Sequence, residues 1–437
     1  MLRSRYAASV CAALVAPTSG LMRPRQPAGR LADALSRRLR ATVDGPLLSG
    51  RKAKIVLDAG PHEVATLTLA DSRLSYRAGA SHSATTLVTS DVSTMTAVVE
   101  GRESGAHMFL GHRLGARGNL SLALVMDGLF DHNVDGIGRP VHWPRSGMVT
   151  AGRIPTAYLE AGPRDAPTIV LLHGLGATNA SLLPLLWDLA PNYHVVAPDL
   201  PGFGATGRPR GRYSPAWFTA WLLKFLDALS IESAVLLGNS MGGRIAIEAG
   251  LTAESRCTAL VLLAPAAAFR RLRQWVPIVR LLRPEFGFLP VPTPAHDMVV
   301  EGIRVLFSDP DRLPPAWYHA GADEFLRVFS SRTGRVAFLA CLRQVYLDEA
   351  YGRRGFWDRL PSLGLPSLFV WGDRDRLVPA SFSRHVRAAL PQSGQIVMED
   401  CGHAPQFEHP DETAAIIRGF LAGLDLPAPA GRQSAGR

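Results

Sequence analysis

The spacing of hydrophobic residues divides the chain into two parts. Residues 54–124 contain short stretches rich in Val, Ile, Leu and Thr, separated by Gly-Pro and Asp-Ser turn residues. These stretches predict a helix from Asp91 to Gly101, a short helix near 107–111 and a last strand at 120–125. Before the helices we expect three or four antiparallel strands, at 54–57, 64–69, 73–77 and 85–88. The pattern predicts a small α+β domain over residues 48–131.

After residue 148 the pattern changes to short apolar runs that alternate with helical stretches. Such alternation is typical of a parallel sheet with crossover helices on both faces, whose buried strands are rich in Val, Ile and Leu. We expect these strands at 168–172, 195–198, 234–237, 259–263, 367–371 and 395–398. The second domain, residues 148–425, is therefore predicted to be an α/β domain with a doubly wound, mostly parallel sheet.

A long insertion, residues 268–362, interrupts the second domain between the fourth and fifth of these strands. Its length exceeds that of an ordinary crossover connection. It carries several aromatic residues: Trp275, Phe286, Phe288, Trp317, Tyr318 and Phe329. We expect a helical cap that roofs the site, although a plain aromatic core inside a helical subdomain explains the same residues.

Much of the positive charge lies at the start of the chain. The formal net charge is +10, and residues 1–40 hold eight basic residues against one acid, Asp33. We interpret residues 1–47 as a basic, partly disordered leader, 132–147 as a linker rich in turn residues and 426–437 as a disordered tail. Because the basic residues gather in a leader rather than along a folded groove, the sequence argues against a nucleic-acid partner.

The leader also bears on location. Leu31, Leu35 and Leu39 are spaced as on one face of a helix surrounded by arginines, which predicts either peripheral contact with anionic lipid or a solvated terminal segment. Residues 3–20 loosely resemble a signal peptide, but their apolar stretch is mostly alanine. The four cysteines are scattered, as is typical of a reducing compartment. We expect a cytoplasmic protein that could associate with a membrane through the leader. Secretion is the weaker hypothesis.

The candidate nucleophile is Ser240, within Gly238-Asn239-Ser240-Met241-Gly242. This pentapeptide follows a predicted strand and precedes a predicted helix, as the Gly-x-Ser-x-Gly motif requires. The serine of such an elbow sits on a sharp turn in a strained backbone conformation, and side chains at Gly238 and Gly242 would collide with the neighbouring strand and helix.

A serine hydroxyl needs a base to take its proton and a carboxylate to orient that base. His403 follows the last predicted strand and is the candidate base. Asp375, which precedes Arg-Leu-Val-Pro, and Asp373 both follow the strand at 367–371 and are the two candidates for this carboxylate.

The negatively charged oxygen of an acyl-transfer intermediate needs amide donors. We expect them from Met241, directly after the nucleophile, and from Leu175 in the loop His173-Gly174-Leu175-Gly176. His173 is expected to be structural. The loop Asp199–Gly204 lacks the Gly-Lys-Ser/Thr ending of a nucleotide loop. Thr66 stands where a zinc-protease helix would place its second histidine, so the sequence implies neither cofactor nor metal.

These motifs, in this order and spacing over residues 148–423, resemble the α/β-hydrolase superfamily. The resemblance implies a cap and a Ser-Asp-His triad. It favours Asp375 as the acid, because the family pattern is an aspartate followed by x-hydrophobic-Val-Pro, and Asp373 is then expected to cap or close the turn. A serine rather than an aspartate at the elbow argues against the epoxide hydrolases and haloalkane dehalogenases of the same fold.

Residues 54–130 resemble the sterol carrier protein family. The resemblance rests on Thr85-x-x-x-x-Ser90-Asp91, the helix ending at Gly101, and Gly118-Asn-Leu-x-Leu-Ala-Leu124. It implies a lipid ligand for this domain; a lipid-free scaffold is the alternative.

Three functions follow as hypotheses. The first is a serine esterase that hydrolyses a small lipophilic carboxylic ester through an acyl-enzyme. The second is a carbon-carbon bond hydrolase of ring-fission products, because Gly-Asn-Ser-Met-Gly-Gly at 238–243 is similar to the elbow of those enzymes. Ala404 stands where they commonly have tryptophan, and no arginine among Arg270, Arg271, Arg273 and Arg280 can be assigned to a substrate carboxylate. The third is a lipid carrier with an inactive hydrolase domain.

Overall fold

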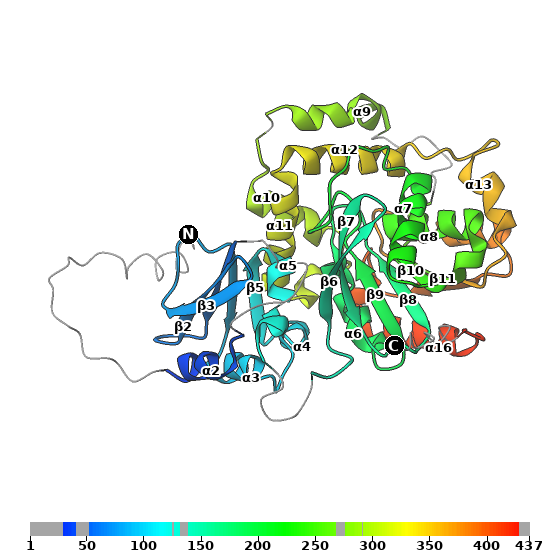
Figure 1. Ribbon diagram of the computed structural model, residues 1–437. Coiled ribbons are helices and arrows are strands. Elements are labelled where there is room, and N and C mark those ends of the chain that lie inside the picture. Colours follow the sequence, from blue (N-terminus) through cyan, green and yellow to red (C-terminus); the bar gives the residue numbers. More distant parts are fainter. Residues whose placement is uncertain are drawn as a thin grey trace, which may run out of the picture.

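A computed structural model describes residues 29–40, 52–124, 126–131, 139–267, 276–290 and 292–427 (Figure 1). The chain forms a small N-terminal unit with a five-stranded sheet and a larger unit with an eight-stranded sheet. The α/β class with a preceding α+β region, as predicted from the sequence, is confirmed.

The N-terminal unit is a sheet backed by short helices. The sheet order is β3-β2-β1-β4-β5. Its strands are β1 (Ala53–Asp58), β2 (Val64–Ala70), β3 (Arg73–Ala78), β4 (Thr86–Ser90) and β5 (Leu114–Gly118). β1 pairs parallel with β4, so the expectation of a wholly antiparallel set was wrong. The helices are α2 (Arg30–Arg38), α3 (Val92–Val99), α4 (Gly105–Leu110) and α5 (Leu120–Leu124), followed by the 3-10 helix η1 (Met126–Leu129).

The segment after Gly118 is a helix, where the sequence predicted a strand. Gly118 has φ +81°, and a Cβ there would lie 2.2 Å from the carbonyl oxygen of Thr85, so the chain turns sharply and the strand ends. The alternating leucines at 120, 122 and 124 are all buried in α5. A short apolar run of this kind does not distinguish strand from helix by its periodicity.

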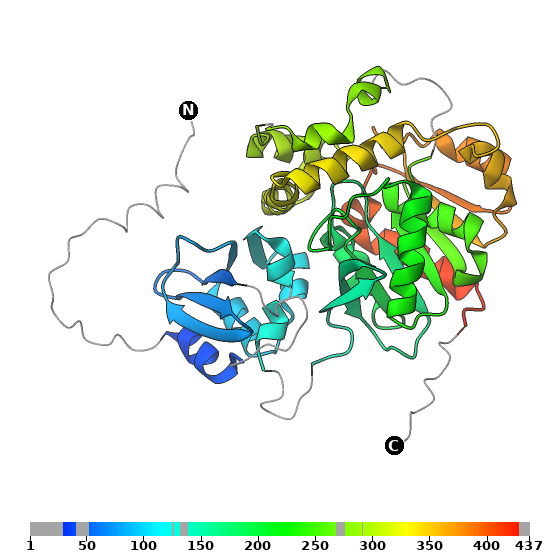
Figure 2. The ribbon, with the colours of Figure 1, turned by 45° about the horizontal axis from the view of Figure 1, so that its top comes forward.

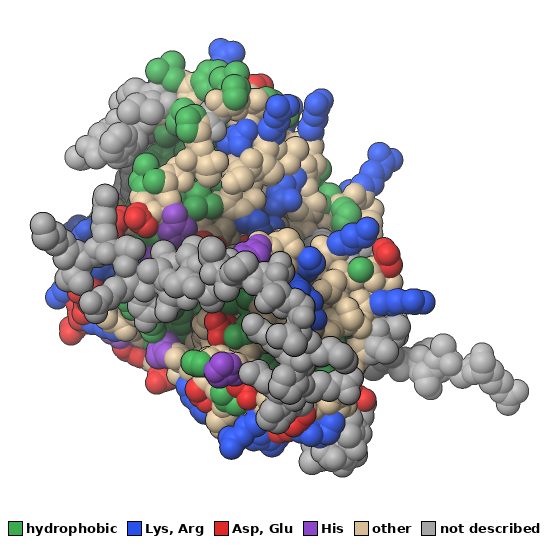
Figure 3. All heavy atoms as spheres, turned by 90° about the vertical axis from the view of Figure 1, so that its left-hand side faces the viewer, with side chains coloured by type: hydrophobic (Ala, Val, Ile, Leu, Met, Phe, Trp, Pro, Cys, Tyr) green, Lys and Arg blue, Asp and Glu red, His purple; other side chains and the backbone are tan. Residues whose placement is uncertain are grey.

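Helix α2 belongs to the N-terminal unit, which corrects the domain boundary predicted at residue 48. Leu31 and Leu35 are 1% and 0% exposed in the core, and the backbone N–H groups of Arg30 and Leu31 donate to Glu63 at 2.9 Å. The apolar face that suggested lipid contact is therefore buried, while Arg37 is exposed and pairs with Glu100. On the face in Figure 3, basic side chains lie in several separate places rather than in one groove.

The remaining leader, linker and tail predictions fall mostly outside the described residues. Residues 1–28, 41–51, 132–138 and 428–437 are not described. The predicted linker ran to residue 147, but strand β6 begins at Arg145.

The larger sheet has the order β13-β12-β11-β10-β8-β9-β7-β6. The six predicted strands are confirmed as β8 (Thr168–Leu172), β9 (His194–Pro198), β10 (Ala234–Asn239), β11 (Cys257–Leu263), β12 (Ser367–Gly372) and β13 (Gly394–Met398). β6 (Arg145–Ala151) and β7 (Ile154–Ala161) are antiparallel additions at one edge that the sequence did not predict. The β6 sequence Arg-Ser-Gly-Met-Val-Thr-Ala is too polar for a buried strand, which explains the omission.

Helices cover both faces of this sheet. α6 (Leu183–Leu189) and α16 (Pro410–Ala422) pack on one face, and α7 (Pro215–Ala228), α8 (Met241–Thr252) and α14 (Phe382–Ala389) on the other. Alternate strand residues such as Leu171 and Leu172 enter the two separate cores. The core on the α6 side is continuous with that of the N-terminal unit.

The insertion forms a cap across the carboxyl ends of the parallel strands (Figure 2). Its described helices are α9 (Val276–Leu281), α10 (His296–Arg304), α11 (Pro315–Phe329), α12 (Arg332–Tyr346) and α13 (Phe356–Arg359). Short 3-10 turns lie between some of them, at η4 (Pro284–Phe288) and η5 (Pro310–Arg312), and η6 (Leu360–Ser362) follows α13. α11 packs against β5 and α5 of the N-terminal unit, so the cap joins the two units.

Candidate active site

Ser240 lies on the sharp turn between β10 and α8. Its backbone has φ 54° and ψ −115°, a conformation that a residue other than glycine adopts only at a cost of order 1–3 kcal/mol. A Cβ at Gly242 would lie 2.0 Å from the carbonyl oxygen of Leu172, and one at Gly238 would lie 2.4 Å from the backbone of Gly242. Strand, turn and helix approach each other so closely that only glycine fits at both positions. The turn presents Ser240 at the edge of the sheet.

His403 and Asp375 form a buried hydrogen-bonded pair. Nδ1 of His403 lies 2.7 Å from Oδ2 of Asp375, and the two residues are 5% and 6% exposed. The other oxygen, Oδ1, accepts from the backbone N–H groups of Leu377 at 2.7 Å and Val378 at 2.9 Å. Since Nδ1 donates to the carboxylate, Nε2 of the neutral imidazole is left without a proton and can act as a base.

The two aspartates that the sequence left open have different surroundings. Asp373 is exposed, and its Oδ1 accepts from the backbone N–H of Cys401 at 3.1 Å. It joins the loop after β12 to the loop before His403, whereas Asp375 contacts His403 itself.

Asn239 is a site residue that the sequence interpretation missed. Its side-chain Nδ2 donates to the carbonyl oxygens of Leu263 at 3.1 Å and His403 at 3.2 Å. The residue next to the nucleophile thus fixes the loop that carries the histidine. A polar amide in the middle of the elbow was the available signal, because a buried amide needs hydrogen-bond partners.

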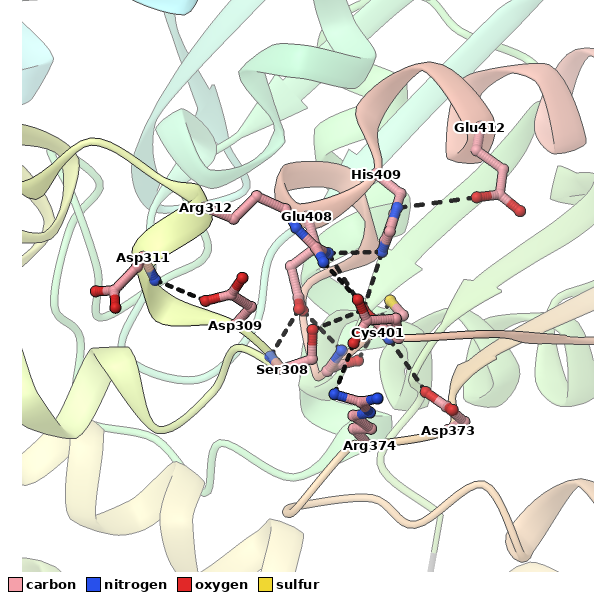
Figure 4. Close-up of polar contacts among 12 residues, drawn as sticks. Ser308, Asp309, Asp311, Arg312, Asp373, Arg374, Cys401, Glu408, His409 and Glu412 are labelled. Carbon is pink, nitrogen blue, oxygen red and sulfur yellow. Dashed lines mark hydrogen bonds and ion pairs between the residues drawn. The ribbon is translucent and has the colours of Figure 1, made fainter.

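A polar network holds the His403 loop against the cap (Figure 4). Glu408, 4% exposed, accepts from the backbone N–H of Gly402 at 2.8 Å and from that of Ser308 at 2.7 Å. Asp400 pairs with Arg312 from the cap at 2.6 Å. The backbone N–H of His403 also donates to the carbonyl oxygen of Leu306 in the cap at 2.7 Å. None of these contacts between distant segments of the chain was predicted from the sequence.

The two predicted amide donors belong to segments that lie next to the nucleophile. Met241 directly follows Ser240 at the first position of α8. Leu175 lines the same cavity as Ser240, and a Cβ on the neighbouring Gly174 would lie 3.3 Å from Cβ of Ser240, so this loop lies against the nucleophile.

His173 is fully buried and hydrogen-bonded. Nδ1 donates to the carbonyl oxygen of Gly174 at 2.8 Å, and Nε2 accepts from the backbone N–H of Leu200 at 2.9 Å. Burial lowers the pKa of His173 to about 4, so it is neutral at physiological pH. This side chain ties together the loops after β8 and β9.

A cavity of about 610 Å³ connects these residues. Ser240 and His403 line it together with the cap helices α10, α11 and α12 and with Phe109 and Leu120 of the N-terminal unit. The described lining is mostly apolar, contains no Lys or Arg, and includes the polar side chains of His403 and Glu324. Cys401 is completely buried but is not among these lining residues.

The described residues contain no group of three or more His, Cys, Asp or Glu side chains that could hold a metal ion. No helix among them is sufficiently long and apolar to cross a bilayer.

Comparisons place the second unit among known enzymes. The model of the alpha/beta hydrolase family matches residues 169–416. A 2-hydroxy-6-oxononadienedioate/2-hydroxy-6-oxononatrienedioate hydrolase from Pseudomonas putida is 30% identical over 276 residues, which is 60% of this chain and 90% of that protein. A 2-hydroxy-6-oxo-6-(2'-aminophenyl)hexa-2,4-dienoic acid hydrolase from Metapseudomonas resinovorans is 27% identical over 293 residues, 63% of this chain and 90% of that protein.

Among solved structures, a bacterial membrane phospholipase A is 26% identical with a TM-score of 0.54, covering 73% of this chain and 92% of its own. The resemblance of residues 54–130 to sterol carriers stays a prediction. Since the family model matches more than half of the sequence, the chain belongs to the alpha/beta hydrolase family.

Proposed function

We propose that the chain is a serine hydrolase that cleaves lipophilic carboxylic esters through an acyl-enzyme. The observation that carries the proposal is the single, mostly apolar cavity shared by Ser240 on its strained turn and by His403, whose Nδ1 is held by Asp375. An apolar cavity favours a substrate with an apolar acyl or alcohol group.

The geometry supports the following roles for these residues. Nε2 of His403 takes the proton of the Ser240 hydroxyl as the Ser240 oxygen bonds to the ester carbonyl carbon. The backbone N–H groups of Met241 and Leu175 donate to the resulting oxyanion, and loss of one such donor typically costs about 10²–10³ in rate. The protonated His403 then gives its proton to the leaving alcohol. Water activated by the same histidine releases the acid and restores Ser240.

A series of p-nitrophenyl esters from acetate to palmitate tests this proposal. Turnover should increase with acyl length and disappear with Ser240→Ala. Ser181→Ala is the matched control, since Ser181 lines the same cavity and its hydroxyl donates to the carbonyl oxygen of Thr178. Turnover that survives Ser240→Ala would overturn the mechanism.

Carbon-carbon bond hydrolysis is the second candidate, because the elbow at 238–243 is similar to that of such enzymes and the two relatives named above are hydrolases of 2-hydroxy-6-oxo acids. Their substrates are anionic, whereas the described lining of this cavity offers no Lys or Arg to bind a carboxylate. This candidate would be favoured if the protein consumed a ring-fission acid but hydrolysed no ester. Consumption of the acid is measured as the loss of its visible absorbance.

A further inference from the structure

The N-terminal unit supplies part of the cavity that holds the candidate nucleophile. Phe109 of α4 and Leu120 of α5 line it with Ser240 and His403, although both precede the larger sheet in the chain. The two side chains are 8% and 7% exposed. Both are apolar and largely buried, so they add apolar surface to the lining of the cavity.

Specific contacts hold these two residues against the cap. The ring of Phe109 stacks on that of Trp317 in α11, with centroids 5.5 Å apart and planes 14° apart. The backbone N–H of Leu120 donates to Glu324 of α11 at 3.3 Å. These contacts join α4 and α5 to the cap helix α11, and α5 lies next to that helix in Figure 1.

Polar contacts at the adjoining strand fix the same arrangement. Asp323 of α11 accepts from the backbone N–H of Gly118 at 2.8 Å and pairs with the guanidinium of Arg117 at 2.6 Å. His296 of α10 lies 3.1 Å from Asp323 as well. Three cap side chains, Trp317, Asp323 and Glu324, thus bind one edge of the N-terminal unit, which makes that unit a wall of the cavity.

We propose that Phe109 and Leu120 determine which apolar tail lengths the active site accepts, so that the N-terminal unit is a specificity element of the enzyme. This inference rests on the proposed ester hydrolysis. Each additional methylene that the cavity buries should raise kcat/KM about fourfold, until the tail meets this wall. Beyond that length the gain should stop, because further carbons have to displace packed side chains.

Variants of Leu120 test the proposal on the full-length chain. Leu120→Ala removes bulk from the wall and should move the preferred acyl length upward by about two carbons. Leu120→Trp should lower kcat/KM on palmitate about tenfold or more, and should lower that on acetate much less.

Leu122→Ala is the matched control. Leu122 lies on the same helix and is 6% exposed, but it is not among the cavity-lining residues, so its chain-length profile should equal that of the wild type. Thermal unfolding verifies that each variant folds, and Phe109→Leu, which also removes bulk from the wall, replaces Leu120→Ala if that variant does not fold.

A binding measurement separates this inference from the proposed reaction. Ser240→Ala protein, with and without each Leu120 substitution, is titrated with fatty acids of increasing length, and tryptophan fluorescence reports binding. The preferred fatty-acid length should shift with the Leu120 substitutions in the same direction as the preferred acyl length in hydrolysis. If neither Leu120 variant changed the dependence of hydrolysis or binding on chain length, the proposed role of the N-terminal unit would be refuted, while the proposed ester hydrolysis would be unaffected. Shifted binding profiles without Ser240-dependent turnover would support the wall and refute the proposed reaction.

Discussion

Replacement of Asp375 by asparagine tests the orientation of the catalytic imidazole. Oδ1 of Asp375 accepts two backbone N–H groups, at 2.7 and 2.9 Å, while Oδ2 accepts from Nδ1 of His403 at 2.7 Å. Asparagine has one oxygen. If this oxygen keeps the backbone bonds, the amide NH₂ faces Nδ1, which must then accept a hydrogen bond. The proton moves to Nε2, and the imidazole can no longer take the proton of Ser240.

The expected loss in kcat is about 10⁴-fold, the size of the same change in other Ser-His-Asp enzymes, which corresponds to about 5.5 kcal/mol of barrier. KM should change less than about threefold, because the lost interaction acts in the transition state. Asp375 is also absent from the cavity-lining residues. The assay is steady-state hydrolysis of p-nitrophenyl butyrate.

Asp373→Asn is the matched control for that experiment, since Asp373 is exposed and does not contact the imidazole. It should keep at least about half of the activity. The reasoning is refuted if Asp375→Asn keeps more than about a tenth of the wild-type kcat, or if Asp373→Asn loses as much.

Two further predictions concern the frame of the site. Gly242→Ala should lower the free energy of unfolding, measured by urea titration, by about 3 kcal/mol or more, because its Cβ would lie 2.0 Å from a backbone oxygen. Gly419→Ala is the control: nothing lies within 4 Å of its Cβ, so it should be neutral or slightly stabilising. Equal losses in both would contradict the steric argument. Glu408→Ala leaves the N–H groups of Gly402 and Ser308 without their carboxylate and should cost about 2 kcal/mol and lower kcat, as followed by thermal unfolding and ester turnover. Glu412→Ala, whose side chain is 59% exposed, should change neither, and an unaffected Glu408→Ala protein would show that this tether is unnecessary.

The parts of the fold that the sequence predicted correctly depend on local patterns. Six strands of the larger sheet are short, apolar and followed by helices, so their periodicity identifies them. The elbow at Ser240 is equally local, because its two glycines and its strand-to-helix position lie within a few residues.

The errors arose where distant residues decide the structure. The helix with Leu31 and Leu35 was expected in a leader outside the small domain, but its apolar face packs in the core of that domain. The leucines at 120, 122 and 124 fit either strand or helix, and the turn at Gly118 against Thr85 decides between them. Glu408 and Ser308 are 100 residues apart in the sequence, so no local pattern could show that one binds the other.

The most direct test of the central claim is covalent labelling of the nucleophile. An alkyl fluorophosphonate, which reacts with an activated serine, should add one label per chain to the wild-type protein, and peptide mass spectrometry should locate it on Ser240. Ser181→Ala protein should be labelled as fast as the wild type, and Ser240→Ala protein should not be labelled. A label on Ser181, or undiminished labelling of Ser240→Ala, would contradict the assignment of Ser240 as the nucleophile.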